Sequence, residues 1–341
     1  MSRERLRSKW GVLEATDTET LRQSLEYAGF GHLAEFIVDG ALDFTAEISA
    51  DWVEVLQLYD NLKKARRDKN ILLRFGAIGE NRVYPTYEGI GTITGRILVT
   101  TPNIQHLKRS SRDIIAPDAG NILLYPDFSQ YEPGVLADDS GDRTLIEIYN
   151  SGDLYKALSL ALFGTEEHRK TAKNLFLSFL YGMSQERMTG LIASFTKIDL
   201  IIAKNLVDSF FGRFINVPHW KQRLCDELLR TGRIGTRDGN YRYRRNKRRN
   251  TLTDVEKRWV ISQRIQGTAS LILKRCILRI QQEVPGSQFL IPMHDAVLYQ
   301  VPVERMNQNK KLIEGVFLEE FSKECKTIKP KISFTPFYCE K

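Results

Sequence analysis

Apolar residues recur at helical spacing through the first 85 residues of the chain. One helix is predicted to run to Tyr27, with its N-terminal cap within residues 18–20 (TET). A second is predicted from Trp52 to Arg67, where the apolar positions are Val53, Val55, Leu56, Leu58 and Leu62. The N-terminal quarter is therefore predicted to be mostly helical.

The pattern changes several times further along. Residues 71–99 consist of short β-prone pieces with many glycines, and residues 121–125 (NILLY) are an apolar run typical of a buried strand. Helical spacing returns over residues 143–231, and a long helix is predicted from Thr253 to Glu283. Two short apolar runs then flank His294-Asp295, which predicts a β-hairpin with an acid at its tight turn. This order favours an α+β protein whose small sheet is assembled from distant segments.

Composition excludes several classes of protein. The chain has 341 residues, 42% apolar and 27% charged, which argues against a disordered or fibrous protein and predicts two or three structural units. No apolar run approaches the roughly 20 residues needed to span a membrane. The N-terminus lacks the apolar core of a secretion signal, and the four cysteines are too scattered for a zinc ribbon or a disulfide framework. We therefore expect an intracellular, cytoplasmic protein without a membrane partner.

Positive charge is concentrated in one basic segment, residues 233–249. It holds eight Lys or Arg residues and one Asp, a local charge of +7 in a chain whose net charge is +8. Such a segment favours a polyanion, and Tyr241 and Tyr243 offer surfaces on which bases stack. The alternative is a solvated basic loop. The candidate phosphate contacts are Arg244, Arg245, Arg248 and Arg249.

Two aspartates stand at the ends of predicted strands. Asp127 follows the NILLY run, and Asp295 occupies the tip of the predicted hairpin. A buried carboxylate is unfavourable unless it is paired or binds a cation, and two on neighbouring strands suit a pair of Mg²⁺ ions for phosphoryl transfer. Each aspartate taken singly also fits a strand-end turn.

A stripe of four residues marks the predicted helix after His168. Its members lie four positions apart, so each is turned only about 40° from the last. They are Arg169, Lys173, Leu177 and Tyr181. With Thr165 as the expected cap and Gly182 as the expected stop, the cations near the helix start would bind a triphosphate while the aromatic end meets a base. The alternative is an amphipathic helix with solvated cations.

Six segments in order resemble family A DNA polymerases, the DNA polymerase I-like enzymes. They are TGR…PNIQ (Thr94–Gln105), DFSQYEPGVLA (Asp127–Ala137), RKTAKNLFLSFLYGMS (Arg169–Ser184), TRDGNYRY (Thr236–Tyr243), RWVISQRIQGTAS (Arg258–Ser270) and MHDAVLYQV (Met293–Val301). The resemblance covers residues 85–341 and implies a right-hand polymerase fold with a small antiparallel palm sheet. It implies a shortened thumb at residues 1–85, a palm at 86–142 and 251–341, and fingers at 143–250, with the nucleotide-binding helix at 168–182.

The resemblance also implies a role for individual residues. Asp127, Asp295 and the carbonyl of Phe128 would bind two Mg²⁺ ions, with Mn²⁺ as an alternative, and Lys173 would protonate the leaving pyrophosphate. The residues implied to contact the incoming deoxynucleotide are Arg169, Lys173, Leu177, Tyr181, Gln130, Tyr155 and Glu132. Of these, Glu132 would exclude the ribose 2′-hydroxyl and pair with Tyr181. The implied DNA contacts are Arg96 and Gln266 in the minor groove, Asn103, Gln105 and Arg258 on the backbone, and His294 beside the primer terminus.

Five features depart from the family pattern. Ala296 stands where a second acid usually follows Asp295, Leu177 replaces an aromatic residue, and Tyr155 replaces a phosphate-binding histidine. Pro133-Gly134 replaces a Leu-Arg pair after Glu132, and Pro126 precedes Asp127. Because proline lacks a backbone N–H, Pro126 predicts a sheet edge or a bulge. Neither metal-binding aspartate nor either triphosphate cation is lost.

The sequence therefore predicts a template-directed DNA polymerase acting on primer–template DNA and deoxynucleoside triphosphates. The roughly 85 residues before the matched region are too few for an exonuclease domain, so we expect no proofreading and low processivity without a partner protein. A phage, plasmid, mobile-element or bacterial setting would suit such a chain. The alternatives are a catalytically impaired primer–template binding protein, a polymerase with relaxed sugar or template choice, and a metal-dependent nuclease.

Overall fold

A computed structural model divides the chain into two units, described separately below. The structure describes residues 2–13, 15–35, 37–38, 41–42, 50–78, 82–246 and 249–338. The first unit comprises residues 1–85 and 102–111, and the second comprises residues 86–101 and 112–341. No helix in the described ranges is long and apolar enough to cross a membrane.

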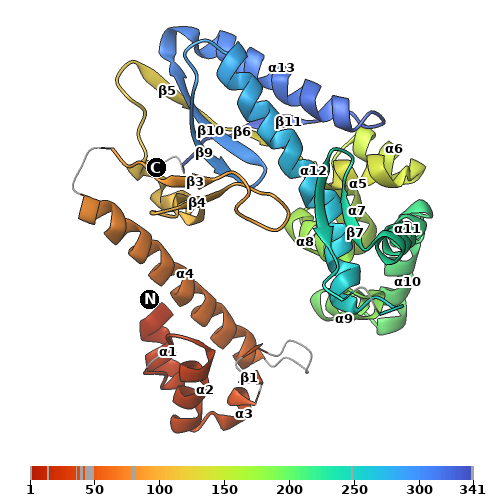
Figure 1. Cartoon of the computed structure of the whole chain (residues 1–341). Coiled ribbons are helices and arrows are strands. Elements are labelled where there is room, and N and C mark those ends of the chain that lie inside the picture. The colour runs from red at the N-terminus through yellow and green to blue at the C-terminus, as the bar shows by residue number, and fades with distance from the viewer. Residues whose placement is uncertain are drawn as a thin grey trace. The chain divides into compact units, whose positions relative to one another are not determined.

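The first unit is helical around a small apolar core (Figure 1). Its elements are α1 (Ser2–Trp10), α2 (Thr18–Tyr27), α3 (Gly31–Ala34), β1 (Ile37–Val38), β2 (Ala41–Leu42), α4 (Ala50–Ile78) and the short turn η1 (Ile104–His106). Trp52 and Val55 of α4 pack with Leu21 and Leu25 of α2 in this core. The α2 cap differs from the prediction. Asp17 accepts the Thr20 N–H while the Thr20 hydroxyl accepts the Asp17 N–H, so the cap lies one residue earlier than expected.

The second unit contains a five-stranded antiparallel sheet (Figure 1). Its strands are β5 (Asn121–Leu124), β6 (Pro126–Phe128), β9 (Gln288–Met293), β10 (Ala296–Pro302) and β11 (Ile332–Phe334). Strand β10 pairs with β9, β5 and β6, and β11 pairs with the other side of β6. The predicted strand and hairpin are thus both present.

Pro126 interrupts a strand in the middle of this sheet. Tyr299 lies opposite Leu124 and Ala296 opposite Asp127, so these pairs are three positions apart on each strand and no residue is inserted. The predicted edge or bulge is therefore wrong. The proline instead leaves a gap between β5 and β6, because it has no N–H for the ladder.

Helices cover the sheet and extend away from it. They are α5 (Tyr131–Ser140), α6 (Arg143–Ser151), α7 (Leu154–Phe163), α8 (Arg169–Leu180), α9 (Gln185–Thr196), α10 (Leu200–Phe211), α11 (Asn216–Thr231), α12 (Asp254–Glu283) and α13 (Met306–Glu324), with the short 3-10 helix η3 (Val303–Arg305). A further 3-10 helix, η2 (Arg109–Ile114), has residues in both units. Two hairpins complete the unit: β3 (Thr86–Glu88) with β4 (Leu98–Thr100), and β7 (Arg233–Thr236) with β8 (Gly239–Tyr243). Helix α12 begins as predicted, with a capping box between Thr253 and Glu256.

The start of α8 differs from the prediction. Its N-cap is His168, which makes no side-chain cap, whereas Thr165 lies in the preceding loop and its hydroxyl accepts the Glu167 N–H. The first turn of α8 therefore has backbone N–H groups without a side-chain cap. The helix does end near Gly182, whose φ of +100° suits glycine.

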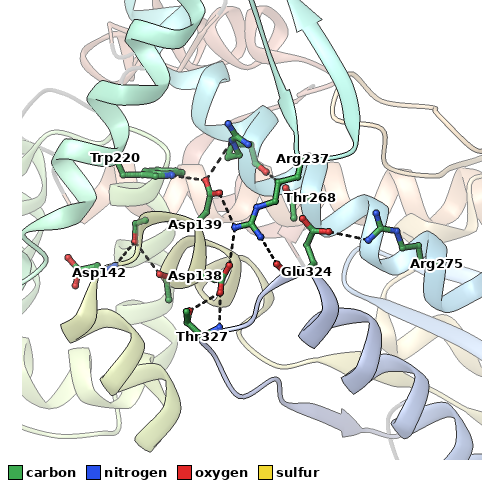
Figure 2. A network of polar contacts seen from close by, with 12 residues as sticks. Asp138, Asp139, Asp142, Trp220, Arg237, Thr268, Arg275, Glu324 and Thr327 are labelled. Carbon is green, nitrogen blue, oxygen red and sulfur yellow. Dashed lines mark hydrogen bonds and ion pairs between the residues drawn. The ribbon is translucent and has the colours of Figure 1, made fainter.

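An acidic network at the end of α5 joins several elements (Figure 2). Asp138 accepts the N–H and hydroxyl of Thr327, both at 2.8 Å, and pairs with Arg237 from the β7–β8 turn at 3.3 Å. Asp139 accepts the indole N–H of Trp220 on α11 at 2.7 Å and lies 3.6 Å from Arg264 on α12. These contacts tie α5, α11, α12 and the hairpin together around two carboxylates.

Removing Asp138 should destabilise this unit strongly. The side chain of Asp138 is only 5% exposed, so Asp138→Ala removes the acceptor of both Thr327 donors and the ion-pair partner of Arg237 at 3.3 Å, which keeps the Glu324 carbonyl and the more distant Asp139. We expect the free energy of unfolding to fall by about 2–4 kcal/mol, measured by urea titration with tryptophan fluorescence. The matched control is Asp208→Ala, which removes an exposed pair with Lys204 and should change stability by less than about 0.5 kcal/mol. Equal losses in both variants would contradict the network's role.

Candidate active site

The central strands bring Asp127 and Asp295 together. Asp127 on β6 lies opposite Ala296, the residue after Asp295, and the Phe128 N–H donates to the Asp295 carbonyl at 3.2 Å. Asp295 lies in the two-residue turn between β9 and β10, where His294 adopts a φ of +55°. The backbone thus fixes both carboxylates at one end of the sheet.

Both aspartates line a cavity of about 300 Å³. Residues from β6, α5, α7, α8 and the loop before β4 also reach it. The lining residues are Arg96, Asp127, Phe128, Gln130, Tyr131, Glu132, Pro133, Tyr155, Lys173, Leu177, His294 and Asp295. Most of the residues expected at the active site therefore share one cavity, although their sequence positions span nearly 200 residues.

The cavity holds more negative charge than its own cations balance. Burial raises the pKa of Asp127, against the influence of Lys173. Burial also raises the pKa of Asp295 to about 6, repulsion from Asp127 adds to this effect, and Arg96 and Lys173 oppose it. Burial and the charge of Asp295 raise the pKa of Glu132. These carboxyls would be stabilised as anions by an additional cation.

The two carboxylates fit a divalent metal by the chemistry of their donors. Mg²⁺ prefers hard oxygen ligands and usually uses one or two protein carboxylates together with water and substrate phosphates. The Phe128 side chain is buried and stacks on Tyr131 with ring centroids 4.2 Å apart. Because a phenylalanine ring has no ligand atom, the backbone carbonyl is the group that Phe128 offers to a metal. Within the described ranges, no group of three or more His, Cys, Asp or Glu side chains is arranged to hold a metal. Ala296 contributes no donor and is buried opposite Asp127.

Helix α8 brings cations to the cavity. Lys173 lines it directly, and Arg169 lies one turn earlier. The guanidinium carbon of Arg169 lies 5.3 Å from the centroid of the Tyr155 ring, and the Lys173 ammonium lies 5.9 Å from it. Leu177 also lines the cavity and packs partly against the core. The predicted stripe therefore contributes Lys173 and Leu177 to the cavity lining, whereas the Arg169 guanidinium is hydrogen-bonded to Asp153.

Glu132 is ion-paired with Arg96 in this structure. The Arg96 guanidinium donates to the Glu132 carboxylate at 2.7 Å. The Tyr181 hydroxyl is buried beside Glu132 and Gln266, and among the described residues it finds no hydrogen-bond partner of normal geometry. The loop of Arg96 is held by Ser270, whose hydroxyl donates to the Gly95 carbonyl at 2.6 Å, and by Asn240, which donates to the Thr94 carbonyl. These contacts bring three of the matched segments together.

The remaining expected DNA contacts are distributed more widely. Gln266 lies beside Tyr181, and Arg258 packs against Gly182, where an added Cβ would come within 3.0 Å of its side chain. Desolvation, and then the charge of Arg96, lower the pKa of His294. Asn103 and Gln105 belong to the first unit, whereas Arg96 belongs to the second. Their contacts with DNA stay predictions.

Arg244 is a structural residue, and its predicted contact with nucleic acid is wrong. Its side chain is only 2% exposed and donates to Glu256 at 2.8 Å and to the carbonyls of Arg249 and Thr251 at 3.1 Å. Elsewhere in the basic segment, Arg233 stacks on Tyr241, and Arg237 belongs to the acidic network. Arg245 and Arg249 are exposed, and Arg248 lies outside the described residues.

Adjacent arginines of the basic segment should therefore behave differently. Replacing Arg245 and Arg249 with alanine should reduce the slope of log affinity against log salt by about 1–2, because each phosphate contact contributes about 0.9. Arg244→Ala should instead lower the free energy of unfolding by about 2–4 kcal/mol, since it removes the buried ion-pair partner of Glu256. Fluorescence anisotropy over a KCl series and urea unfolding measure the two effects. An unchanged salt slope in the double variant would show that the exposed arginines do not bind DNA.

The sequence did not reveal two contacts near the cavity. Gln130, expected to bind nucleotide, accepts the Leu154 N–H at 2.8 Å and thereby caps α7. Asp153 caps the same helix and pairs with Arg169. An Asp before an apolar run does indicate a helix N-cap, so the first role of Asp153 was recognisable in residues 152–156 (GDLYK). Its pairing with Arg169 was not.

Comparison with known proteins identifies the family. The sequence profile of DNA polymerase family A matches residues 41–329. The chain therefore belongs to DNA polymerase family A, and the resemblance found in its motifs is confirmed.

Individual relatives are distant and longer than this chain. It is 28% identical over 258 residues to the thermostable DNA polymerase I of Thermus aquaticus, a match covering 69% of this chain and 30% of that protein. It is 26% identical over 276 residues to DNA polymerase I of Aquifex aeolicus (strain VF5), covering 77% of this chain and 47% of that protein. The chain thus spans about a third to a half of the length of these relatives.

A solved structure shares the fold. The POL domain of Pol1 from M. smegmatis, in complex with DNA primer-template and dNTP, superimposes with a TM-score of 0.68 at 22% identity. The match covers 94% of this chain and 55% of that one. The predicted α+β class and polymerase-domain fold are therefore confirmed.

Proposed function

We propose that the chain is a template-directed DNA polymerase that adds deoxynucleotides to the 3′ end of a primer. The observation that carries the proposal is the single cavity shared by Asp127, Asp295 and Lys173, two buried carboxylates and a cation from a neighbouring helix. The solved relative is bound to DNA primer-template and dNTP, which supports the same ligands here. In this proposal residues 86–142 and 251–341 form the palm, residues 143–250 the fingers and residues 1–85 a shortened thumb.

Asp127, Asp295 and the Phe128 carbonyl would hold two Mg²⁺ ions, or Mn²⁺ in their place. Bound metal would supply positive charge that stabilises the ionised primer hydroxyl and the departing pyrophosphate. The raised pKa values of both aspartates support this role, because their charges are poorly balanced by the protein alone.

The remaining side chains would position the reactants. The primer 3′-oxygen forms a bond to the α-phosphorus as the bond to pyrophosphate breaks, and its proton passes to solvent. Lys173 donates a proton to the departing pyrophosphate, and Arg169 and Lys173 neutralise its charge. Glu132, which is 9% exposed in the cavity wall, crowds the 2′ position of the sugar. Deoxynucleotides are therefore the proposed substrates.

Primer extension tests the proposal. A labelled DNA primer on a DNA template is incubated with Mg²⁺ and deoxynucleotides, ribonucleotides or neither. Extension with deoxynucleotides alone supports the proposal, and extension with ribonucleotides indicates relaxed choice of sugar. Extension in a parallel assay on an RNA template indicates relaxed choice of template. Tight binding without extension indicates a catalytically impaired binding protein, and primer shortening in magnesium alone indicates a nuclease. A mismatched primer incubated without nucleotides measures proofreading, whose absence stays a prediction.

A further inference from the structure

Asp153 connects the start of α7 to Arg169 of α8. One carboxylate oxygen, Oδ1, accepts the backbone N–H groups of Tyr155 and Lys156 at 2.9 and 3.1 Å. The other, Oδ2, accepts from Nε and Nη2 of Arg169 at 2.9 and 2.7 Å. The two oxygens therefore have separate roles, since one caps a helix and the other holds a guanidinium.

The start of α7 is itself held in place. Gln130, at the beginning of α5, accepts the Leu154 N–H at 2.8 Å. Lys331, next to strand β11, donates to the carbonyls of Tyr149, near the end of α6, and of Gly152, which directly precedes Asp153. Residues next to β6 and β11 thus fix the backbone around Asp153. Because this backbone is fixed, the Asp153 carboxylate can hold the long, flexible side chain of Arg169 in one orientation.

The surroundings of Arg169 leave one edge of its guanidinium for a ligand. Nε and Nη2 are directed to Asp153, and the guanidinium carbon lies over the buried Tyr155 ring, 5.3 Å from its centroid. Among the described residues, Nη1 makes no hydrogen bond to protein, and the Arg169 side chain is 42% exposed. Burial raises the pKa of Tyr155, so its hydroxyl stays neutral and the ring supplies a face rather than a charge. The Lys173 ammonium lies 5.9 Å from the centroid of the same ring.

We propose that Asp153 is a positioning residue that holds the Arg169 guanidinium in its phosphate-binding orientation before the nucleotide arrives. This inference rests on the proposed polymerase function. A fixed arginine loses less side-chain entropy on binding a triphosphate than a mobile one. Asp153 contacts the start of α7 and Arg169 and is not among the residues that line the cavity, so its effect is expected on nucleotide affinity rather than on the chemical step.

Asparagine at position 153 separates the two roles of the aspartate. Asparagine is as good an N-cap as aspartate, so its Oδ1 keeps α7 capped. Its Nδ2 is a donor and faces the Arg169 donors, so the support of Arg169 is lost. The matched control is Asp199→Asn, since Asp199 caps α10 through the Ile201 N–H and pairs with no arginine among the described residues.

Single-nucleotide incorporation is measured against deoxynucleotide concentration for both variants. Asp153→Asn should raise the KM for nucleotide about tenfold, with kcat within about threefold and primer–template affinity within about twofold. Asp199→Asn should match wild type. In an Arg169→Ala background, Asp153→Asn should add nothing, because its effect acts through the arginine. The inference would be overturned if the KM of Asp153→Asn equalled or fell below that of Asp199→Asn. It would also be overturned if Asp153→Asn raised KM as much in the Arg169→Ala background as in wild type.

Nucleotide binding distinguishes this inference from the proposed function. Binding of a fluorescent deoxynucleotide in the presence of Mg²⁺ is titrated for the same variants. If wild type binds nucleotide but does not extend primers, the polymerase proposal fails, whereas a tenfold weaker affinity in Asp153→Asn still supports the positioning role. If wild type neither extends primers nor binds nucleotide, both are overturned.

Discussion

The Asp295→Asn variant is expected to lose at least about 10³-fold in nucleotide incorporation while binding primer–template within about threefold of wild type. Asparagine keeps the shape of the side chain but removes the charge on which metal binding in the cavity would depend. DNA affinity depends mainly on exposed cations and should be spared. Single-turnover incorporation and fluorescence anisotropy measure the two quantities. Retained synthesis would refute the assignment of Asp295.

Stability measurements control for misfolding in this variant. In the folded protein the pKa of Asp295 is raised from its ordinary 3.8 to about 6, so its charge lowers stability progressively as the pH rises through this range. At pH 7.5, metal-free Asp295→Asn should therefore unfold with a free energy at least equal to that of metal-free wild type. Asp254→Asn, at an exposed residue of α12, should leave both activity and stability near wild type. A clearly less stable Asp295→Asn protein would mean that its inactivity has a structural cause.

Replacing Lys173 with alanine should lower kcat by about 10²–10⁴-fold, the range typical of a general acid. Lys173 lines the cavity with both aspartates, and its charge opposes the rise in their pKa values. The expected KM for nucleotide also rises, because a phosphate-binding cation is lost. Steady-state incorporation over a range of deoxynucleotide concentrations measures both constants.

Lys173→Arg separates the two contributions of the lysine. Arginine restores the positive charge but gives up its proton far less readily, so KM should recover while kcat stays low. The control is Lys170→Ala, an exposed cation on the same helix that does not line the cavity. Full recovery of kcat by arginine would show that Lys173 acts through its charge rather than as an acid.

Much of the fold could be predicted because local patterns encode it. The apolar run at residues 121–125 became β5, the two runs around His294-Asp295 became a hairpin, and Thr253 caps α12. These predictions use side-chain periodicity and turn chemistry, which act over a few residues. The predicted cap of α8 was wrong because several nearby polar residues suit an N-cap. Which of them lies at the start of the helix depends on the path of the preceding loop. The sheet edge or bulge predicted at Pro126 was wrong because the missing N–H does not indicate which strands flank the residue.

The candidate site was predictable as a set of residues but not as a set of contacts. The aspartates and the cations of α8 were identified from spacing and from family motifs, and the structure gathers most of them in one cavity. Nothing local indicates that Glu132 pairs with Arg96, 36 positions away, or that Asp153 supports Arg169. Such pairs depend on which elements pack together.

The basic segment illustrates the difference between properties that the sequence determines and properties that packing determines. Its residue types alone establish a strong local positive charge, since ionisation at neutral pH hardly depends on the fold for arginine. Whether a given arginine is available to a polyanion depends on packing. Arg244 is buried against Glu256 from α12, whereas Arg245, its neighbour in the chain, is exposed. Composition and periodicity thus define elements and charge, and the sequence motifs identify the family. The assignment of partners to each charged group requires the folded chain, because an ion pair forms between groups that are close in space rather than in sequence.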